Sequence, residues 1–550
     1  MTPLFDAHLH PSLKKQFADP GETAALPMLN PWRTALRQDF LQAFAEISPK
    51  KCFIKPFVES TLVSQASLTQ LAAGQYALAI AVLYFPDKEL LRLILSNKLF
   101  ESIVKKSLFG SIITEDRLLG FLNAAGAFDT VLEDLHLLSM SDGQRTVRFY
   151  NGGPFQPGAV PALVFSVEGL HCLRSDFDNT DPARVLQNIR ENLDTLLAQP
   201  IKLISVNIAH IDNSNELFAN QAYAVDGFRE GAFDERALRP AGNGLTQVGK
   251  DAVSLLYEKN LLPDVKHMSW KARRELYAFR KAAGFDQPVI CSHAGFAGCW
   301  FDSNGESLSD YILAIVPEGP QSRLILGKPN PYFDDHQIGF NASSINLFNE
   351  DIAEIFLSGG LIGLSMDQRI LGYSDVHDAN GMPTNVFPFP MPGGPMPVLT
   401  DSDYISASEL AEEPVFRTAQ PDGARIIRGI TPDSRDIVNA DNIRDFYHPR
   451  HFYLHIMHAM VIAGFLGGQD AVRKMLTQTL CIGSDFDGLI DGIDCCRNVT
   501  DTASLRQRFI VEFPKFLKEI PLALPDGLSI EKVADRIFYE NGRDFVLSRP

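Results

Sequence analysis

Seven side chains that can bind metal ions or transfer protons stand where short apolar runs of this 550-residue sequence stop. In chain order they are His8, His10, Glu168, His210, His267, His293 and Asp485. Neutral imidazoles and carboxylates are the ligands that zinc and related divalent ions take in proteins. Seven such residues at successive strand ends are hard to assign to a solvated surface. The pattern therefore predicts a metal centre with an acid/base group beside it.

The first two histidines have the spacing His8-Leu9-His10. Alternate residues of a strand face the same side, so we expect both imidazoles to point to one ion. A carboxylate such as Glu168 has an oxygen for each of two ions and can bridge them. Two ions lower the pKa of a shared water and give hydroxide near neutral pH. Asp485, in "GSDFDG", is then the expected proton acceptor and donor.

Each residue taken alone also has a structural interpretation. A turn carboxylate accounts for Glu168, a hydrogen-bonded core histidine for His210, and an exposed or helix-terminal histidine for His267. The metal hypothesis rests on their joint occurrence. A second group of histidines, in "HPRHFYLHIMH" (448–458), has an i, i+4 pair but no H-E-x-x-H motif. We predict that these four lie on a helix surface or in packing.

Eight apolar runs of strand character must position these side chains. They cover 4–11, 76–86, 161–171, 201–210, 261–267, 288–295, 359–367 and 479–488. Several are apolar on both faces, as in parallel strands buried under helices. Helical patterns such as 181–199, which opens with Asp181-Pro182, and 246–262 lie between them. Eightfold strand–helix alternation predicts a (β/α)8 TIM barrel. A doubly wound sheet is the alternative, but no G-x-G-x-x-G or Walker A motif is present.

Two segments exceed what a minimal barrel needs. Residues 297–345 include "NPYFDDHQ", and residues 373–447 include the Pro- and Gly-rich run "GMPTNVFPFPMPGGPMP". Both follow a predicted strand end, on the face where barrel enzymes carry their active sites. We expect one barrel domain over 1–550, with these segments as loop insertions that form a lid.

Composition excludes several partner classes. The net charge is −17, with 67 acidic against 50 basic residues, whereas nucleic acids and anionic membranes attract clustered Lys and Arg. No window has the ~20 uncharged apolar residues of a membrane span, and no secretory signal is visible. The seven cysteines include no C-x-x-C pair and predict buried thiols, not a disulfide framework. We therefore expect a cytoplasmic globular protein.

The motifs together resemble the membrane (renal) dipeptidase family, peptidase family M19, within the amidohydrolase-like metal-dependent hydrolases. The matching stretches are "DAHLH" (6–10), "SVEGLH" (166–171), "ISVNIAHIDNSN" (204–215), "GNGLTQVGKDAVSLLYEKNLLPDVKHMS" (242–269), "PVICSHAG" (288–295) and "IGSDFDG" (482–488). The run 529–546 is similar to the helix that closes these barrels. The blocks keep the family's order over nearly the whole chain and leave out chiefly the two insertions.

The resemblance implies a role for each of the seven residues. His8 and His10 would bind one zinc, and His267 and His293 a second, with Glu168 bridging both ions. His210 would contact the substrate and steady the tetrahedral intermediate, and Asp485 would be the catalytic acid/base. Asp487 and Asp491 would shape the turn around it. The resemblance also implies a homodimer.

The sequence departs from the family pattern at two site positions. His10 stands where the family's first motif usually has Asp, as in the wider amidohydrolase superfamily, and makes the site one charge more positive. The family's arginine for the substrate carboxylate, which precedes an asparagine, corresponds to Ile345-Asn346. That arginine is therefore missing from the sequence.

We predict a metal-dependent hydrolase that cleaves an amide or peptide bond of a dipeptide-like substrate through metal-activated hydroxide. One alternative is an amidohydrolase that acts on a cyclic amide, lactone, N-acyl amino acid or phosphoester. The missing arginine and the long insertions favour it. Another is a catalytically silent barrel that binds a ligand or partner through its Pro-rich segment.

Overall fold

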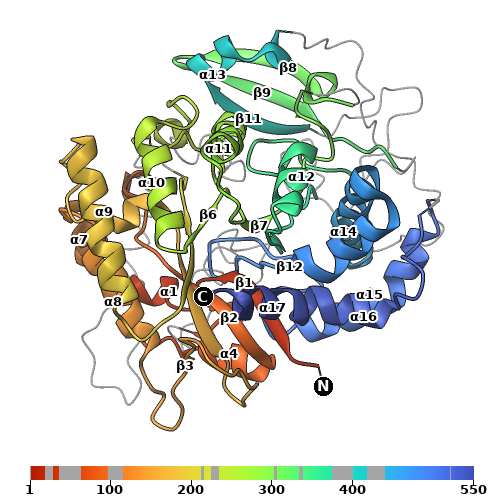
Figure 1. The fold of residues 1–550 in the computed structure, drawn as a ribbon, viewed down its shortest axis with the longest axis horizontal. Coiled ribbons are helices and arrows are strands. Elements are labelled where there is room, and N and C mark those ends of the chain that lie inside the picture. Colours follow the sequence, from red (N-terminus) through yellow and green to blue (C-terminus); the bar gives the residue numbers. More distant parts are fainter. Residues whose placement is uncertain are drawn as a thin grey trace.

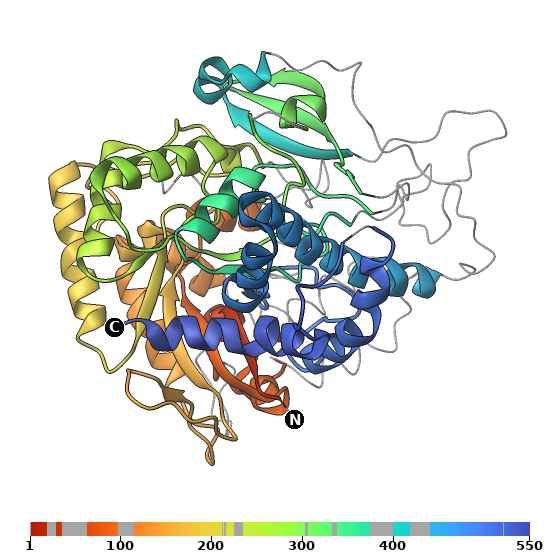
Figure 2. The ribbon, with the colours of Figure 1, turned by 45° about the vertical axis from the view of Figure 1, so that its right-hand side comes forward.

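The computed structural model describes residues 2–18, 29–35, 63–96, 115–211, 213, 216–224, 235–302, 306–332, 338–373, 400–417, 440–520 and 522–550. Strands and helices alternate along most of this chain, and helices surround a central group of strands (Figures 1 and 2). The fold is mixed α/β with parallel sheets at its centre.

All eight predicted strands are present, each shorter than the apolar run that predicted it. They are β1 (Leu4–Leu9), β2 (Tyr76–Leu83), β4 (Ala162–Val167), β5 (Leu203–Asn207), β6 (Leu262–Asp264), β7 (Cys291–Ala294), β10 (Ile362–Leu364) and β12 (Leu480–Ile482). Every residue of these strands is buried, which explains why their sequences are apolar on both faces. The polar residues that end each run lie at or beyond the last residues of the strands.

The strands pair in parallel and largely in chain order. One sheet has the order β1-β2-β4-β5-β6, with the short β3 (Arg148–Phe149) also paired to β4, and a second has the order β12-β10-β7. Single parallel bridges join the two sheets at both ends, Asp264 to Ile290 and Leu9 to Phe486. A doubly wound sheet would reverse its order at a switch point. The observed order does not reverse.

The helices that follow these strands have the following bounds. They are α1 (Leu13–Gln16), α4 (Leu68–Ala73), α5 (Lys88–Ser96), α7 (Glu115–Asn123), α8 (Phe128–Leu138), α9 (Pro182–Leu197), α10 (Gln247–Glu258), α11 (Trp270–Ala283), α12 (Asn349–Leu357), α14 (Ala440–Lys474), α15 (Thr502–Leu517), α16 (Ile530–Asp535) and α17 (Asn541–Ser548). The predicted helices 181–199 and 246–262 correspond to α9 and α10. Asp181 caps α9, because its side chain accepts the Arg184 N–H, and Pro182 follows at the first helical position.

Two glycines allow three strands to approach closely below the polar cluster. A Cβ on Gly363 of β10 would lie 1.8 Å from the carbonyl oxygen of Ser292, and one on Gly483 after β12 would lie 1.9 Å from it. Both contacts are far inside van der Waals distance. Glycine at 363 and 483 therefore lets β10 and β12 pack around the strand that carries Ser292 and His293.

The two insertions contain regular structure, so the expectation of plain loops was incomplete. Residues 297–345 include β8 (Ile312–Glu318) and β9 (Gln321–Gly327), and residues 373–447 include β11 (Thr400–Ser406) and α13 (Ala407–Glu412). These strands form one antiparallel sheet in the order β11-β9-β8, seen at the top of Figure 1. The Pro-rich run at 381–397 lies outside the described residues.

The helix predicted at 448–468 is the centre of α14. Its helical geometry is interrupted at Gly467 and Gly468, and Gly468 has a φ of 63° that favours glycine. By length and composition, the segment Arg444–Thr479 is the one helix in the described chain that could cross a membrane, and 67% of its most apolar window is buried inside the protein. Such burial is typical of a core helix.

Candidate metal centre

All seven predicted side chains meet at the carboxyl ends of the parallel strands. His8 and His293 lie within β1 and β7, and His10 and Glu168 follow β1 and β4 directly. His210, His267 and Asp485 each lie three residues beyond their strands. Parallel strands bring their carboxyl ends to one edge, so residues up to 477 positions apart in the sequence become neighbours.

The carboxylate of Glu168 is the centre of the cluster. Its Oε1 lies 3.3 Å from His8 Nε2 and 3.2 Å from His267 Nε2, and its Oε2 lies 3.3 Å from His10 Nε2. His293 Nε2 is 3.8 Å and His210 Nε2 3.6 Å from the same carboxylate. Five imidazoles therefore direct the same ring nitrogen, Nε2, at one buried carboxylate.

The imidazoles also lie close to each other, as two pairs, around Glu168. His8 Nε2 is 3.2 Å from His10 Nε2, and His267 Nε2 is 3.2 Å from His293 Nε2. The prediction that His8 and His10 face the same side is thus confirmed. These two pairs are the ones that the resemblance assigns to two separate ions.

The separations match the edges of a coordination tetrahedron. Nitrogen and oxygen ligands at about 2.0–2.1 Å from zinc lie about 3.3 Å from each other. The Nε2–Nε2 and Nε2–carboxylate distances of 3.2–3.3 Å fall at this value. Groups within ligand distance of one another are His8, His10 and Glu168, then His8, His293 and Asp485, and then Glu168, His210 and His267. The donor set and its spacing therefore fit divalent metal ions.

Electrostatics leave two of the imidazoles ready to bind a cation and a third protonated. Burial lowers the pKa of His267 to about 3 and holds that of His293 well below its usual value, so both rings are neutral with a free lone pair. Burial would also lower the pKa of His10, but Glu168 and Asp485 beside it raise it to about 10. Burial would raise the pKa of Glu168, yet the neighbouring imidazoles of His210, His8 and His10 hold it well below its usual range. Without an ion, His10 is therefore protonated at neutral pH, and a metal ion must displace this proton before the Nε2 of His10 can bind it.

Asp485 differs from the other six residues in the exposure of its side chain. Its side chain is 16% exposed, against 10% or less for the imidazoles and Glu168. Its Oδ1 lies 3.4 Å from His10 Nε2, and its Oδ2 lies 3.8 Å from His293 Nε2. Asp485 and His267 both have left-handed backbone conformations, with φ of 63° and 68°. Such strained non-glycine residues cluster at functional sites.

Ser292 is a site residue that the sequence did not single out. Its Oγ lies 2.9 Å from His8 Nδ1 and 3.0 Å from His293 Nδ1, and its side chain also hydrogen-bonds to the buried Asp264. A hydroxyl has one proton and two acceptor sites. If the proton goes to Asp264, Ser292 accepts an N–H from both rings and leaves both Nε2 atoms with lone pairs. The only indication of this role in the sequence was the position of Ser292 within the predicted strand, directly before His293.

Asp87 and Tyr84 are two further site residues missed in the sequence. Asp87 lies between β2 and α5, is fully buried, and contacts His210 Nδ1 through its Oδ2. The Tyr84 hydroxyl donates to the same oxygen. Burial would raise the pKa of Asp87 and lower that of His210, but their attraction reverses both shifts. The run "LYFPD" gave a polar residue after strand two, yet nothing in it indicated a histidine partner.

The position that corresponds to the family's arginine has no cationic side chain of its own, although the buried Lys266 lies beside it and donates to the Ile345 carbonyl oxygen at 3.2 Å. Ile345 is buried, and Asn346 next to it binds backbone groups, accepting the Gly295 N–H and donating to the carbonyls of Asn341 and Ile370. Its role in the described structure is to hold neighbouring loops together.

The other acidic and histidine candidates have packing roles. Asp487 accepts hydrogen bonds from the backbone of Gln65 and Ala66 and pairs with Lys14, so it fixes the chain around the turn. Asp491 accepts from Gln368. The four histidines of α14 are all buried, which confirms packing and makes the surface alternative wrong: His448, His451, His455 and His458.

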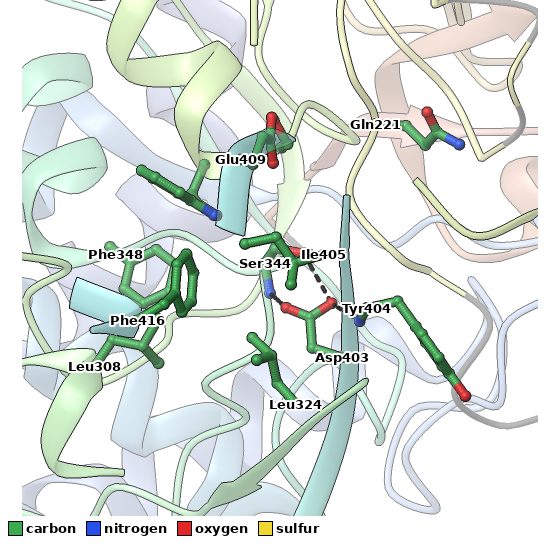
Figure 3. Close-up of a pocket in the computed structure, with 12 residues that line it drawn as sticks. Gln221, Leu308, Leu324, Ser344, Phe348, Asp403, Tyr404, Ile405, Glu409 and Phe416 are labelled. Carbon is green, nitrogen blue, oxygen red and sulfur yellow. Dashed lines mark hydrogen bonds between the residues drawn. The ribbon is translucent and has the colours of Figure 1, made fainter. Parts of the chain in front are cut away.

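A separate small cavity lies where the insertion sheet meets the rest of the chain (Figure 3). Its volume is about 10 Å³, room for about one water molecule. Two buried carboxylates beside it join the segments: Asp403 accepts from the N–H and hydroxyl of Ser344, and Glu409 accepts from Ser269 and the Gly244 N–H. This cavity lies between the insertion sheet and the rest of the chain, and none of the seven cluster residues lines it.

Comparison with known proteins gives structural matches alone, since no family model and no curated protein matches the sequence. One match is a metallopeptidase from Rhodobacter sphaeroides, crystallised with a phosphinate mimic of the dipeptide L-Ala-D-Ala. The match has 12% sequence identity and a TM-score of 0.42, and it covers 100% of this chain and 99% of that chain. The dipeptidase AC, a metallopeptidase of family M19, has 12% identity, coverage of 100% and 98%, and a TM-score of 0.42. The probable dipeptidase PvdM from Pseudomonas aeruginosa has 14% identity, coverage of 88% and 87%, and a TM-score of 0.38. M19 is the family whose motifs the sequence resembles.

Proposed function

We propose that this chain is a metal-dependent hydrolase that cleaves amide or peptide bonds, with a dipeptide-like substrate, and that its parallel strands form a (β/α)8 barrel. The observation that supports it is the convergence of five imidazole Nε2 atoms on the buried Glu168 at 3.2–3.8 Å. A packing cluster has no chemical need for five imidazoles that all present the same nitrogen to one carboxylate.

The residues divide into two ligand sets that share Glu168. His8 and His10 would hold one divalent ion, and His267 and His293 the other, with Glu168 between them. Zinc suits this set of imidazoles and carboxylate. When bound, two such ions lower the pKa of a water and polarise a carbonyl oxygen.

The remaining residues act on the substrate. Asp485 is the most exposed of the seven and lies 3.4 Å from His10 Nε2, so it can accept the proton of the attacking water and pass it to the leaving amine. His210 presents its Nε2 to the same space and, with a proton on both ring nitrogens, would donate to the oxyanion of the tetrahedral intermediate. Burial would lower the pKa of His210, but the carboxylates of Asp87 and Glu168 raise it, which favours that form. Burial of the cluster strengthens both interactions because it excludes competing water.

One observation favours a second candidate within the same reaction class. The position of the family's substrate-carboxylate arginine is the buried Ile345. A substrate without that carboxylate, such as a cyclic amide or a lactone, would not need it. The silent-barrel alternative depended on the Pro-rich segment, which lies outside the described residues. A cytoplasmic location and a homodimer stay predictions.

The test is a hydrolysis panel on the metal-loaded, chelated and reloaded enzyme. The panel holds L,L- and L,D-dipeptides, N-acyl amino acids, cyclic amides and lactones, with release of amine or acid as the readout. We expect cleavage of at least one amide class that stops on chelation and returns with zinc. Hydrolysis that is insensitive to chelation, or none of any class by enzyme with full metal content, would contradict the proposal.

A further inference from the structure

We propose that Asp87, itself held by Tyr84, is a positioning residue that fixes the ring orientation of His210 and keeps it as a substrate contact beside the four metal-binding imidazoles. The inference rests on the proposed hydrolase function and extends it to two residues that no motif includes.

The three side chains form a chain of contacts behind the metal centre. Asp87 is fully buried, and its Oδ2 contacts His210 Nδ1. The Tyr84 hydroxyl donates to the same Oδ2, and the Asp87 N–H donates to the Tyr84 oxygen at 3.2 Å. Tyr84 ends the buried run after β2, so the loop before α5 fixes the carboxylate in place. The carboxylate is therefore held before His210 meets it.

The contact determines which nitrogen of His210 faces the cluster. A carboxylate only accepts hydrogen bonds, so the proton must lie on Nδ1. The opposite nitrogen, Nε2, then points at Glu168 Oε2, 3.6 Å away. Without Asp87, the Tyr84 hydroxyl at 3.4 Å is the remaining described contact of Nδ1, and a hydroxyl can either donate or accept. Both tautomers would then be allowed.

The other four imidazoles have no such carboxylate. The Nδ1 atoms of His8 and His293 share the Ser292 hydroxyl. The Nδ1 atoms of His10 and His267 have no hydrogen-bond partner among the residues that the structure describes. His210 is thus the one ring of the five, within that part of the chain, that is oriented by a buried acid.

Distance alone does not separate His210 from the ligands, since Glu168, His210 and His267 lie within ligand distance of one another. The His210 Nε2 is 3.6 Å from Glu168, whereas His8, His10 and His267 lie at 3.2–3.3 Å, the tetrahedral edge length. Because the proposed function assigns His210 to the substrate and not to an ion, metal content should not depend on Asp87. His293, at 3.8 Å from Glu168, is placed with the ligands by its 3.2 Å contact with His267.

The test compares Asp87→Asn and Asp87→Ala with the wild type in four measurements: kcat, KM, metal per chain, and the imidazole N–H signals of ¹⁵N-histidine-labelled protein. We expect kcat to fall about 10²-fold or more, with KM changed less than about threefold. Metal per chain should stay at the wild-type value. A strongly deshielded Nδ1–H signal, assigned by its absence in His210→Gln, should disappear from both variants.

Asp351→Asn is the matched control. Asp351 is also buried and accepts from a tyrosine hydroxyl, Tyr277, and from a cation, Arg273, but it lies on α12 and contacts none of the five imidazoles. The Asp351→Asn variant should have a lower free energy of unfolding than the wild type but keep its kcat and the deshielded Nδ1–H signal. Asp87→Asn keeps the size of the side chain, so it tests the inference even if Asp87→Ala does not fold.

The measurements distinguish a failure of the positioning role from a failure of the proposed function. An unchanged kcat, or a deshielded signal that persists in Asp87→Asn, would overturn the positioning role. Loss of metal from both Asp87 variants would make His210 a ligand and overturn its role as a substrate contact. If the wild type hydrolyses no panel substrate, the proposed function fails, and the N–H signals and metal content still decide the inference.

Discussion

Ser292→Ala should weaken both metal sites at once, because one hydroxyl lies behind a ligand of each proposed ion. The Oγ of Ser292 is 2.9 Å from Nδ1 of His8 and 3.0 Å from Nδ1 of His293. Alanine removes this shared acceptor but keeps the strand backbone. Both rings would then lose the contact that fixes their orientation and keeps the Nε2 lone pair available.

The size of the effect on zinc affinity follows from the number of hydrogen bonds that Ser292→Ala removes. Each hydrogen bond of this kind contributes about 1 kcal/mol, which is about a fivefold change in a dissociation constant. Each ion loses one such bond, so the product of the two dissociation constants should rise about 30-fold. Removal of an outer partner of a histidine ligand typically costs 10–100-fold in metal affinity, so about fivefold per ion is the smallest effect expected.

The assay is a competition titration of zinc between the apoprotein and a chromophoric chelator, which resolves both dissociation constants. Ser365→Ala is the matched control: Ser365 is buried after the neighbouring strand β10 and accepts the Asp367 N–H, but binds no imidazole. Both constants should rise in Ser292→Ala and stay within about twofold in the control. If both are unchanged in Ser292→Ala, or if only one rises, the shared role of the hydroxyl is refuted.

Three further changes test how the fold supports the centre. Asp487→Asn should lower the free energy of unfolding in urea by about 3 kcal/mol at pH 7, because it leaves the buried Lys14 amine without its carboxylate at 2.8 Å. Because Lys14 and Lys15 outweigh the effect of burial and hold the folded pKa of Asp487 below its usual 3.8, the gap between variant and wild type should narrow only below pH 3.8, as the pH falls through the folded pKa; a gap that is constant with pH would contradict the ion pair. Gly363→Ala should cost about 3 kcal/mol in the same measurement, because its Cβ would lie 1.8 Å from the Ser292 carbonyl oxygen; an unfolding curve like that of the wild type would contradict this packing. Asp403→Ala removes the acceptor of two Ser344 hydrogen bonds, and we expect faster proteolysis within 400–417 with little change in metal content; loss of metal would mean that the insertion sheet supports the centre directly.

The eight strands and the seven cluster residues were predictable for one reason. Strands buried on both faces read as short apolar runs, and their carboxyl ends meet at one edge. A polar residue at the end of such a run therefore has neighbours from the other runs, although Glu168 and Asp485 are far apart in the sequence. The ends of the strands were less predictable. The runs that end in His210 and His267 go on for three residues after the strands β5 and β6 have ended.

The residues behind the imidazoles could not be predicted from their own surroundings. Ser292 meets a histidine 284 positions away, and Asp87 meets one 123 positions away. Such pairs leave no spacing pattern in a single sequence. In the insertion sheet, the pairing of β9 with β11 was missed for a similar reason, because a long segment separates these strands; β8 and β9 form a local hairpin that we did not predict.

The metal content of the purified protein, measured by plasma mass spectrometry, tests the central claim most directly. The comparison is wild type, Glu168→Ala, and Glu409→Ala as a second buried glutamate outside the cluster. We predict about two zinc or similar ions per chain in the wild type and in Glu409→Ala, and loss of both ions in Glu168→Ala, because its carboxylate serves both ligand pairs. A wild-type protein that holds no metal after incubation with zinc would contradict the account, and the five imidazoles would then have to be explained as a binding pocket.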